Sequence, residues 1–224
     1  MKYANAPSPV PDAEDAPAKR GYKQGARARS AEQTAERILD AFAHRIRDDW
    51  FDQVTLDQIA RDAGVTVPTV VRRFGGKEGL LDAVQKRLAT EITERRRIAP
   101  GDIAHALAIL MEDYEATGDL VMRVLAQEER HAPFKSMADI GRVFHRNWLS
   151  SVFAPWLEGL PDAARQARLD ALVVASDIYV WKLARRDMGR SRAETLTLFH
   201  TLVEAIIGTA AEASIARPQE PRNV

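Results

Sequence analysis

The sequence of 224 residues contains no cysteine, which excludes disulfide bonds, thiolate zinc sites and cysteine nucleophiles. It also contains no run of eighteen apolar residues, and its N-terminus lacks the charged-then-apolar order of a secretory signal. We therefore expect no membrane span and a cytoplasmic location. Apolar residues make up 46% of the chain, which is ample for a folded core.

The usual sequence signals of catalysis are missing as well. The five histidines show neither the HExxH pattern nor another metal-binding spacing, and no GxSxG nucleophile turn is present. The segment "GGKEG" at residues 75–79 lacks the earlier glycine of a phosphate-binding loop. We predict no catalytic residue, no metal site and no cofactor. A helical enzyme remains a rival interpretation, which substrate turnover by the purified chain would reveal.

Neither sign of charge is in excess, since 32 Lys and Arg balance 32 Asp and Glu. The two signs are not evenly distributed along the chain, however. Residues 17–100 hold 17 basic against 12 acidic residues, whereas residues 101–224 hold 14 basic against 17 acidic ones. This asymmetry indicates a polyanionic partner for the first hundred residues, with chance clustering as the alternative.

Residues 1–29 carry four prolines, few bulky apolar residues and no periodicity, so we predict a disordered arm that is basic in its second half. From residue 30 onward the apolar residues recur at helical intervals, and no alternating strand pattern competes. Capping boxes are predicted at Ser30 with Gln33, Thr55 with Gln58, and Ser191 with Glu194. Residues 217–224 are predicted to be a disordered tail.

These signals predict an all-α chain of nine helices without a sheet. The first helix runs from Ser30 to about Asp49, Asp102 and Asp119 each cap a helix, and another helix is centred on residues 140–152. Two long helices end the chain, at about 162–188 and 191–216. We expect a three-helix domain over residues 30–76 and a larger helical domain over residues 77–216.

Two short helices joined by "DAGV" at residues 62–65 are typical of a helix-turn-helix. In the second of them, Val70 and Phe74 are spaced to face the core, which turns Arg72 outward. We assign Arg72 to base edges and Arg73 to phosphate, because only a base contact discriminates sequence. The alternative is that this arginine pair is ordinary solvated surface.

The motif resembles the DNA-binding domain of the TetR family of bacterial transcriptional regulators. The resemblance covers residues 34–88 and is carried by "ILDAF" and by "TLDQIARDAGVTVPTVVRRFGGKEGLLDAV". Val71 stands where the family usually has a phosphate-contacting Tyr, and nothing is carried over there. The motif and the resemblance together give these candidate DNA contacts: Arg27, Arg29, Thr55, Thr66, Val67, Pro68, Thr69, Arg72, Arg73 and Lys77.

Within that set, Arg27 and Arg29 belong to the basic arm and are assigned to an adjacent minor groove. A solubilising tail without contacts is the alternative for them. The Thr66 hydroxyl and the helix N-terminus at Lys77 are suited to phosphate oxygens, because the first turn of a helix has unpaired N–H groups.

Both predicted long helices at the C-terminus carry apolar stripes, and the first also has a second stripe through Val174 and Ile178. A helix that is apolar on more than one side needs two partners, so we predict a homodimer, as the resemblance also implies. A thicker monomer core is the alternative. The predicted interface residues are Leu172, Tyr179, Leu183, Leu196, Phe199, Val203 and Ile206.

Aromatic residues gather between the motif and the last helices, where the family places an effector pocket. We name Phe144, Trp148, Asp177 and Trp181 as candidate effector contacts, although core packing uses the same residue types. The resulting hypothesis is a ligand-responsive, sequence-specific transcriptional repressor released from double-stranded operator DNA by a small molecule. A ligand-independent architectural DNA-binding protein is the alternative.

Overall fold

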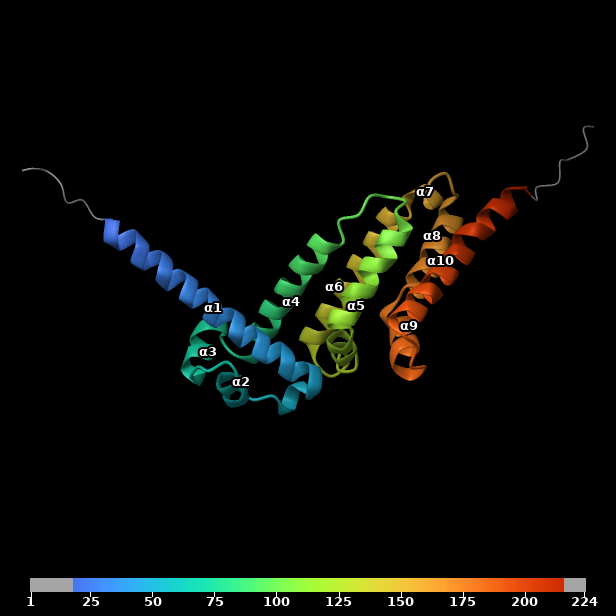
Figure 1. The fold of residues 1–224 in the computed structure, drawn as a ribbon. Coiled ribbons are helices and arrows are strands. Elements are labelled where there is room, and N and C mark those ends of the chain that lie inside the picture. Colours follow the sequence, from blue (N-terminus) through green and yellow to red (C-terminus); the bar gives the residue numbers. More distant parts are fainter. Residues whose placement is uncertain (1–17, 216–224) are drawn as a thin grey trace, which may run out of the picture.

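A computed structural model of the chain describes residues 18–215, with side chains for residues 29–208. All regular elements in this range are helical, which confirms the predicted all-α class (Figure 1). The first group is α1 (Ala18–Asp48), the 3-10 helix η1 (Phe51–Gln53), α2 (Leu56–Asp62), α3 (Val67–Phe74) and α4 (Lys77–Arg95). The second group is α5 (Ile103–Leu125), α6 (Ala132–Val152), α7 (Ala154–Leu157), α8 (Asp162–Ala175), α9 (Ile178–Lys182), the π-helix η2 (Leu183–Asp187) and α10 (Arg192–Ile215).

The N-terminal group packs α2 and α3 beneath α1, and α4 leads from them toward the second group (Figure 1). Its core is formed by fully buried residues such as Ile38, Phe42, Ile59, Val70 and Leu80. Ion pairs hold the helices in place at the surface: Arg45 bonds Asp62 at 2.6 Å, and Arg87 bonds Asp40 at 2.7 Å. The α2–α3 unit is therefore fixed on a small rigid base.

A second apolar core lies between α5, α6, α8, α9 and α10 and includes Leu107, Trp181 and Phe199. The two cores are close to each other, because Leu120 and Val124 of α5 and Phe134 of α6 belong to the first. The N-terminal domain predicted for residues 30–76 therefore shares its core with the larger domain, and α4 contributes Leu80, Leu81 and Val84 to it.

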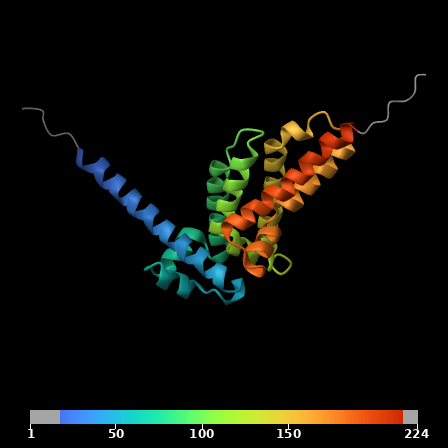
Figure 2. The same cartoon turned by 45° about the vertical axis from the view of Figure 1, so that its right-hand side comes forward.

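Helix α1 is longer than expected. It begins at Ala18, so Ser30 and Gln33 lie inside it and form no capping box, and residues 18–29 are helical where we predicted a disordered arm. Proline is absent between Pro17 and Pro68, and Ala, Lys, Arg and Gln are good helix formers, which favours this extension. The N-terminal half of α1 extends away from the other helices in both views (Figures 1 and 2). The rest of the predicted arm, residues 1–17, and the tail, residues 217–224, lie outside the described residues.

Two further boundaries differ from the prediction. Helix α5 continues through Asp119, which does not cap a new helix but forms an ion pair with Arg186 at 2.8 Å. Helix α6 begins at Ala132, with Pro133 in its first turn, where the missing N–H costs nothing.

The long helix predicted for residues 162–188 is interrupted. α8 ends at Ala175, and Asp177 takes an extended conformation and caps α9 by accepting a hydrogen bond from the Tyr179 amide at 2.9 Å. The Ser176 hydroxyl donates to the Leu172 carbonyl at 2.8 Å at the same point. Such local bonds compete with the helical ladder, and the break turns Trp181 into the core.

Candidate nucleic-acid interface and ligand pocket

The α2–turn–α3 unit is built from local signals that the sequence shows. Thr55 caps α2 in a complete capping box with Gln58, as predicted. Gly64 takes a φ of 64° in the turn, which L side chains rarely adopt. Ile59, Ala60 and Val70 are buried between the helices, so the opposite side of α3 is left to solvent.

Where α4 packs against the end of α3, Gly79 has no room for a side chain. Gly75 ends α3 in the left-handed conformation, and a Cβ on Gly79 would overlap the Phe74 carbonyl. The first turn of α4 therefore lies directly against the end of α3 and fixes its direction.

The outward side of α3 carries most of the predicted contact residues. Thr66, Pro68, Arg72 and Arg73 are exposed, and neither guanidinium has an interaction partner among the described residues. Val67 and Thr69 are half-buried, and the Thr69 hydroxyl lies 3.0 Å from that of Thr66. Two cations and two hydroxyl groups thus share one accessible helix face.

Two other predicted contacts have structural roles. Lys77 donates from Nζ to the Phe51 carbonyl at 2.7 Å and lies 4.4 Å from the centre of the Phe51 ring, so its ammonium is directed into the protein. The Thr55 hydroxyl is occupied in the capping box. Arg29 is exposed on α1, and the side chain of Arg27 lies outside the described residues.

Sequence reasoning missed Val71. It is 42% exposed, and it lies four residues after Val67 and three after Pro68, so it shares their helix face. An exposed methyl-bearing side chain on such a face can contact the methyl group of thymine. Its position in the helical repeat would have indicated this.

A pocket of about 260 Å³ lies between α4, α5, α6 and the α8–α9 junction. Its wall is mainly aliphatic, with Leu88 and Ile92 from α4, Val121 and Leu125 from α5, and Ile140 from α6. Polar groups also reach it: Arg96, Tyr114, Thr117, His145 and Asp177. An apolar cavity with a few convergent polar groups is typical of a small-molecule site.

One of the two cations that line the pocket, Arg96, is held by a buried carboxylate. Arg96 donates from Nε to Asp113 Oδ2 at 2.6 Å, and Arg95 donates to Oδ1 of the same carboxylate at 2.7 Å. The side chains of Arg96 and Asp113 are only 6% and 1% exposed. The Arg96 guanidinium also lies over the rings of Phe144 and Trp148, so it is fixed on several sides.

His145 is buried in the pocket wall, and burial, assisted by the Arg96 charge, lowers its pKa to about 3. Its Nε2 lies 3.3 Å from the Ser176 hydroxyl, while its Nδ1 has no partner among the described residues. Because its pKa lies well below 7, the His145 ring is neutral at physiological pH. Burial also raises the pKa of Asp177, in spite of the hydrogen bond that Asp177 accepts from the Tyr179 amide.

Two of the four predicted effector contacts, Phe144 and Asp177, line the pocket. Trp148 and Trp181 do not. Trp148 stacks on His145 and donates to the Arg96 carbonyl at 3.0 Å, whereas Trp181 is fully buried and donates to Glu115 at 3.0 Å. Both are large side chains that the surrounding core requires, which is the alternative that sequence analysis had left open.

Comparisons with known proteins agree with this geometry. Residues 38–84, from α1 to α4, match the family model described as bacterial regulatory proteins, tetR family. This match identifies the segment from α1 to α4 as a TetR-family DNA-binding domain. An uncharacterized HTH-type transcriptional regulator of Mycobacterium tuberculosis is 36% identical over 100 residues, which is 42% of this chain and 51% of that protein. The chain thus spans about half the length of the curated relatives it matches.

The overall fold resembles solved structures of transcriptional regulators. A tetR-family transcriptional regulator from Streptomyces coelicolor aligns with a TM-score of 0.62 at 19% identity, over 83% of this chain and 85% of its own. A transcriptional regulator from Rhodococcus aligns with a TM-score of 0.57 at 17% identity, over 84% and 100% of the two chains. These likenesses extend over both cores.

Several predicted interface residues of the chain are buried in its own core. Leu172, Phe199 and Val203 are fully buried, and Leu196 and Ile206 are half-buried against the second core. Tyr179 and Leu183 are each 52% exposed, but they lie on α9 and η2. The predicted stripe was the inward side of the helix pair, because large apolar residues mark the side that packs within the protomer.

The outward side of α8 and α10 carries small residues instead. On α8 these are Ala164, Ala167 and Val174, and on α10 they are Thr197, Thr201 and Ala205. Both threonine hydroxyls donate to carbonyls of their own helix, so they present little unsatisfied polarity.

Among the described residues, no helix is both long enough and apolar enough to span a membrane, and no group of three or more potential metal ligands comes together.

Proposed function

We propose that this chain is a sequence-specific, DNA-binding transcriptional regulator that acts as a homodimer and responds to a small molecule. The observation that carries the proposal is the outward face of α3, with Arg72 and Arg73 exposed and unpaired on a rigidly held helix. A regulator of this kind acts where the chromosome lies, so the proposal includes a cytoplasmic location and no catalytic step.

In this proposal α3 enters the major groove. Arg72 donates to a guanine edge, Val71 contacts a neighbouring thymine methyl, and Arg73 binds phosphate. The hydroxyls of Thr66 and Thr69 and the amides at the α4 N-terminus supply further phosphate contacts. The Lys77 ammonium has no part in DNA binding, because Phe51 already holds it.

The homodimer is proposed to form through the small-residue face of α8 and α10, which run side by side at the edge of the molecule (Figure 2). Small side chains let two helix pairs approach closely, and a two-fold axis there gives two α3 helices that address one DNA site. The half-sites are then separated by about one helical turn of DNA, roughly 34 to 36 Å.

The ligand is proposed to act from the pocket on the N-terminal domain. Leu88, Val124 and Met137 line the pocket and also belong to, or pack against, the N-terminal core. Release of DNA on ligand binding is the direction we propose. The change in DNA affinity is limited by the difference in ligand affinity between the two states, typically about 1 to 3 kcal/mol.

The test is DNA binding by matched arginine variants, on a site selected from random sequence. Arg72→Ala is expected to cost about 1 to 3 kcal/mol on the selected site and to relax the preference at one position. Arg73→Ala is expected to weaken binding to all sequences and to lower the slope of log K against log salt by about 0.9. Arg97→Ala, which removes an exposed arginine beyond the far end of α4, is the control and should change neither.

Equal effects of the two substitutions on selected and random DNA would contradict the assignment. Protection of a long, asymmetric stretch with weak sequence preference would support the architectural alternative instead.

A further inference from the structure

The hydrogen bonds around the pocket determine which proton His145 carries. The Ser176 hydroxyl has one proton, and it donates that proton to the Leu172 carbonyl at 2.8 Å. Toward His145 Nε2, at 3.3 Å, the hydroxyl can therefore act only as an acceptor. Because burial keeps the ring neutral, the single ring proton lies on Nε2, and Nδ1 is a bare acceptor.

Two of the hydroxyls that line the pocket are committed as donors as well. Tyr114 donates to the Ser176 carbonyl at 2.9 Å, and Thr117 donates to the Asp113 carbonyl at 2.7 Å. Each keeps acceptor capacity only. Nδ1 of His145 has no partner among the described residues, so it is left without a proton donor.

Charge in the pocket is balanced. Arg96 is paired with Asp113, and Asp177 contributes a carboxyl group to the pocket lining. Arg142, at the rim, is bonded to Glu128 at 2.7 Å and to Asp139 at 3.0 Å. Asp177 would repel a bound anion and Arg96 would repel a bound cation. A net charge of either sign on the ligand is therefore disfavoured.

From these observations we infer that the pocket accepts an uncharged molecule with an apolar body and one hydroxyl or N–H group, which donates its proton to Nδ1 of His145. This inference rests on the proposed ligand-responsive function. The cavity of about 260 Å³ is under twice the roughly 150 Å³ that holds benzene, which limits the ligand to about ten non-hydrogen atoms.

The test compares four compounds of similar length on the full chain without DNA: 1-octanol, heptyl methyl ether, octanoate and octylamine. Octanol and the ether have the same number of heavy atoms, but only octanol donates a hydrogen bond. Calorimetric titration is expected to give octanol about tenfold tighter binding than the ether, the size of one hydrogen bond between neutral groups. Octanoate and octylammonium are expected to bind more weakly than octanol.

The variant His145→Leu removes the acceptor and should abolish the preference for octanol over the ether while both still bind. Equal affinities of the two compounds in the unmodified protein would overturn the inference, as would tighter binding of octanoate or no saturable binding of octanol. Since no DNA is present, these outcomes are separate from the proposed function. Octanol that binds as described but leaves DNA affinity unchanged would contradict the switching mechanism alone.

Discussion

The buried histidine makes the stability of the protein depend on pH in a window that can be calculated. Burial lowers the pKa of His145 to about 3, against a reference value of 6.5 for an exposed histidine. Between these values the unfolded chain binds a proton at this position and the folded chain does not. Stability therefore rises with pH across this window, and it is lost as the pH falls below 6.5.

The magnitude follows from how far the pH lies below the upper limit of the window, the unfolded pKa of 6.5. At pH 5 the unfolded histidine lies 1.5 pH units below its pKa, and each unit corresponds to about 1.4 kcal/mol, so the folded state loses about 2 kcal/mol. This is a large part of the 5 to 15 kcal/mol typical of a folded domain. The result is insensitive to the folded pKa as long as it stays below about 4.

The assay is urea denaturation of the unmodified chain and of His145→Gln at pH 8 and pH 5. For each protein we take the change in unfolding free energy between pH 8 and pH 5. The contributions of other titrating groups and the packing cost of the substitution cancel when these two changes are compared. The unmodified chain is expected to lose about 2 kcal/mol more than the variant. His105→Gln is the matched control, because the His105 side chain is 56% exposed in the folded chain. Equal losses of unfolding free energy between pH 8 and pH 5 in the unmodified chain and in His145→Gln would refute this prediction.

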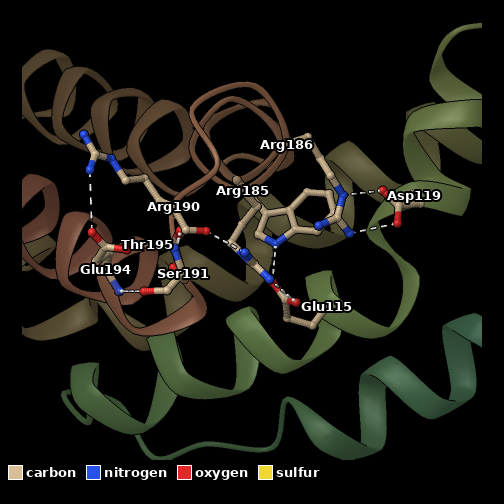
Figure 3. A network of polar contacts seen from close by, with 9 residues as sticks. Glu115, Asp119, Arg185, Arg186, Arg190, Ser191, Glu194 and Thr195 are labelled. Carbon is tan, nitrogen blue, oxygen red and sulfur yellow. Dashed lines mark hydrogen bonds and ion pairs between the residues drawn. The ribbon is translucent and has the colours of Figure 1, made fainter.

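Two further predictions concern the contact between α5 and the α9–η2 segment (Figure 3). Arg185 and Trp181 both donate to Glu115 and lower its pKa to about 2, so Glu115→Gln should destabilise the fold by about 2 kcal/mol at pH 7, after discounting for its partial exposure. The stabilisation by Glu115 is complete above pH 4.5 and is lost as the pH falls through 2. The difference in unfolding free energy between the unmodified chain and the variant should therefore shrink by more than half at pH 3. A difference that stays constant with pH would contradict this prediction. Gly118→Ala places a Cβ 2.5 Å from the buried Trp181 ring and should destabilise by about 1 to 3 kcal/mol, although alanine is the better helix former. Gly141→Ala, with nothing within 4 Å, should instead stabilise slightly, and thermal melts that rank the two alike would count against this contact.

The features that sequence analysis predicted well are those fixed within a few residues. Thr55 with Gln58, Asp102 and Ser191 with Glu194 each cap a helix through bonds that span three positions, so the sequence alone contains both partners. The outward position of Arg72 follows in the same way from the spacing of Val70 and Phe74.

The features it missed depend on partners far along the chain. The break at Ser176 brings Trp181 onto Gly118 and Glu115, more than sixty residues away, and no local pattern shows that contact. Lys77 matched the family motif, yet its ammonium is bound by Phe51, 26 residues earlier. The apolar stripe of α10 indicated burial correctly but could not say whether the same subunit or a partner covers it.

In the proposed ligand response, the contact of Lys77 with Phe51 provides the link between the pocket and α3. Phe51 is a shared support: its carbonyl and ring hold Lys77 at the start of α4, its amide donates to Gln127 at 2.9 Å, and its ring packs edge-on against Phe134 of α6. In the proposed mechanism, a ligand that displaces α4 must therefore either carry this group with it or break the part-buried hydrogen bond from Lys77. Since the latter costs about 1 to 3 kcal/mol, comparable to a typical allosteric coupling, moving α3 with the pocket is the cheaper response.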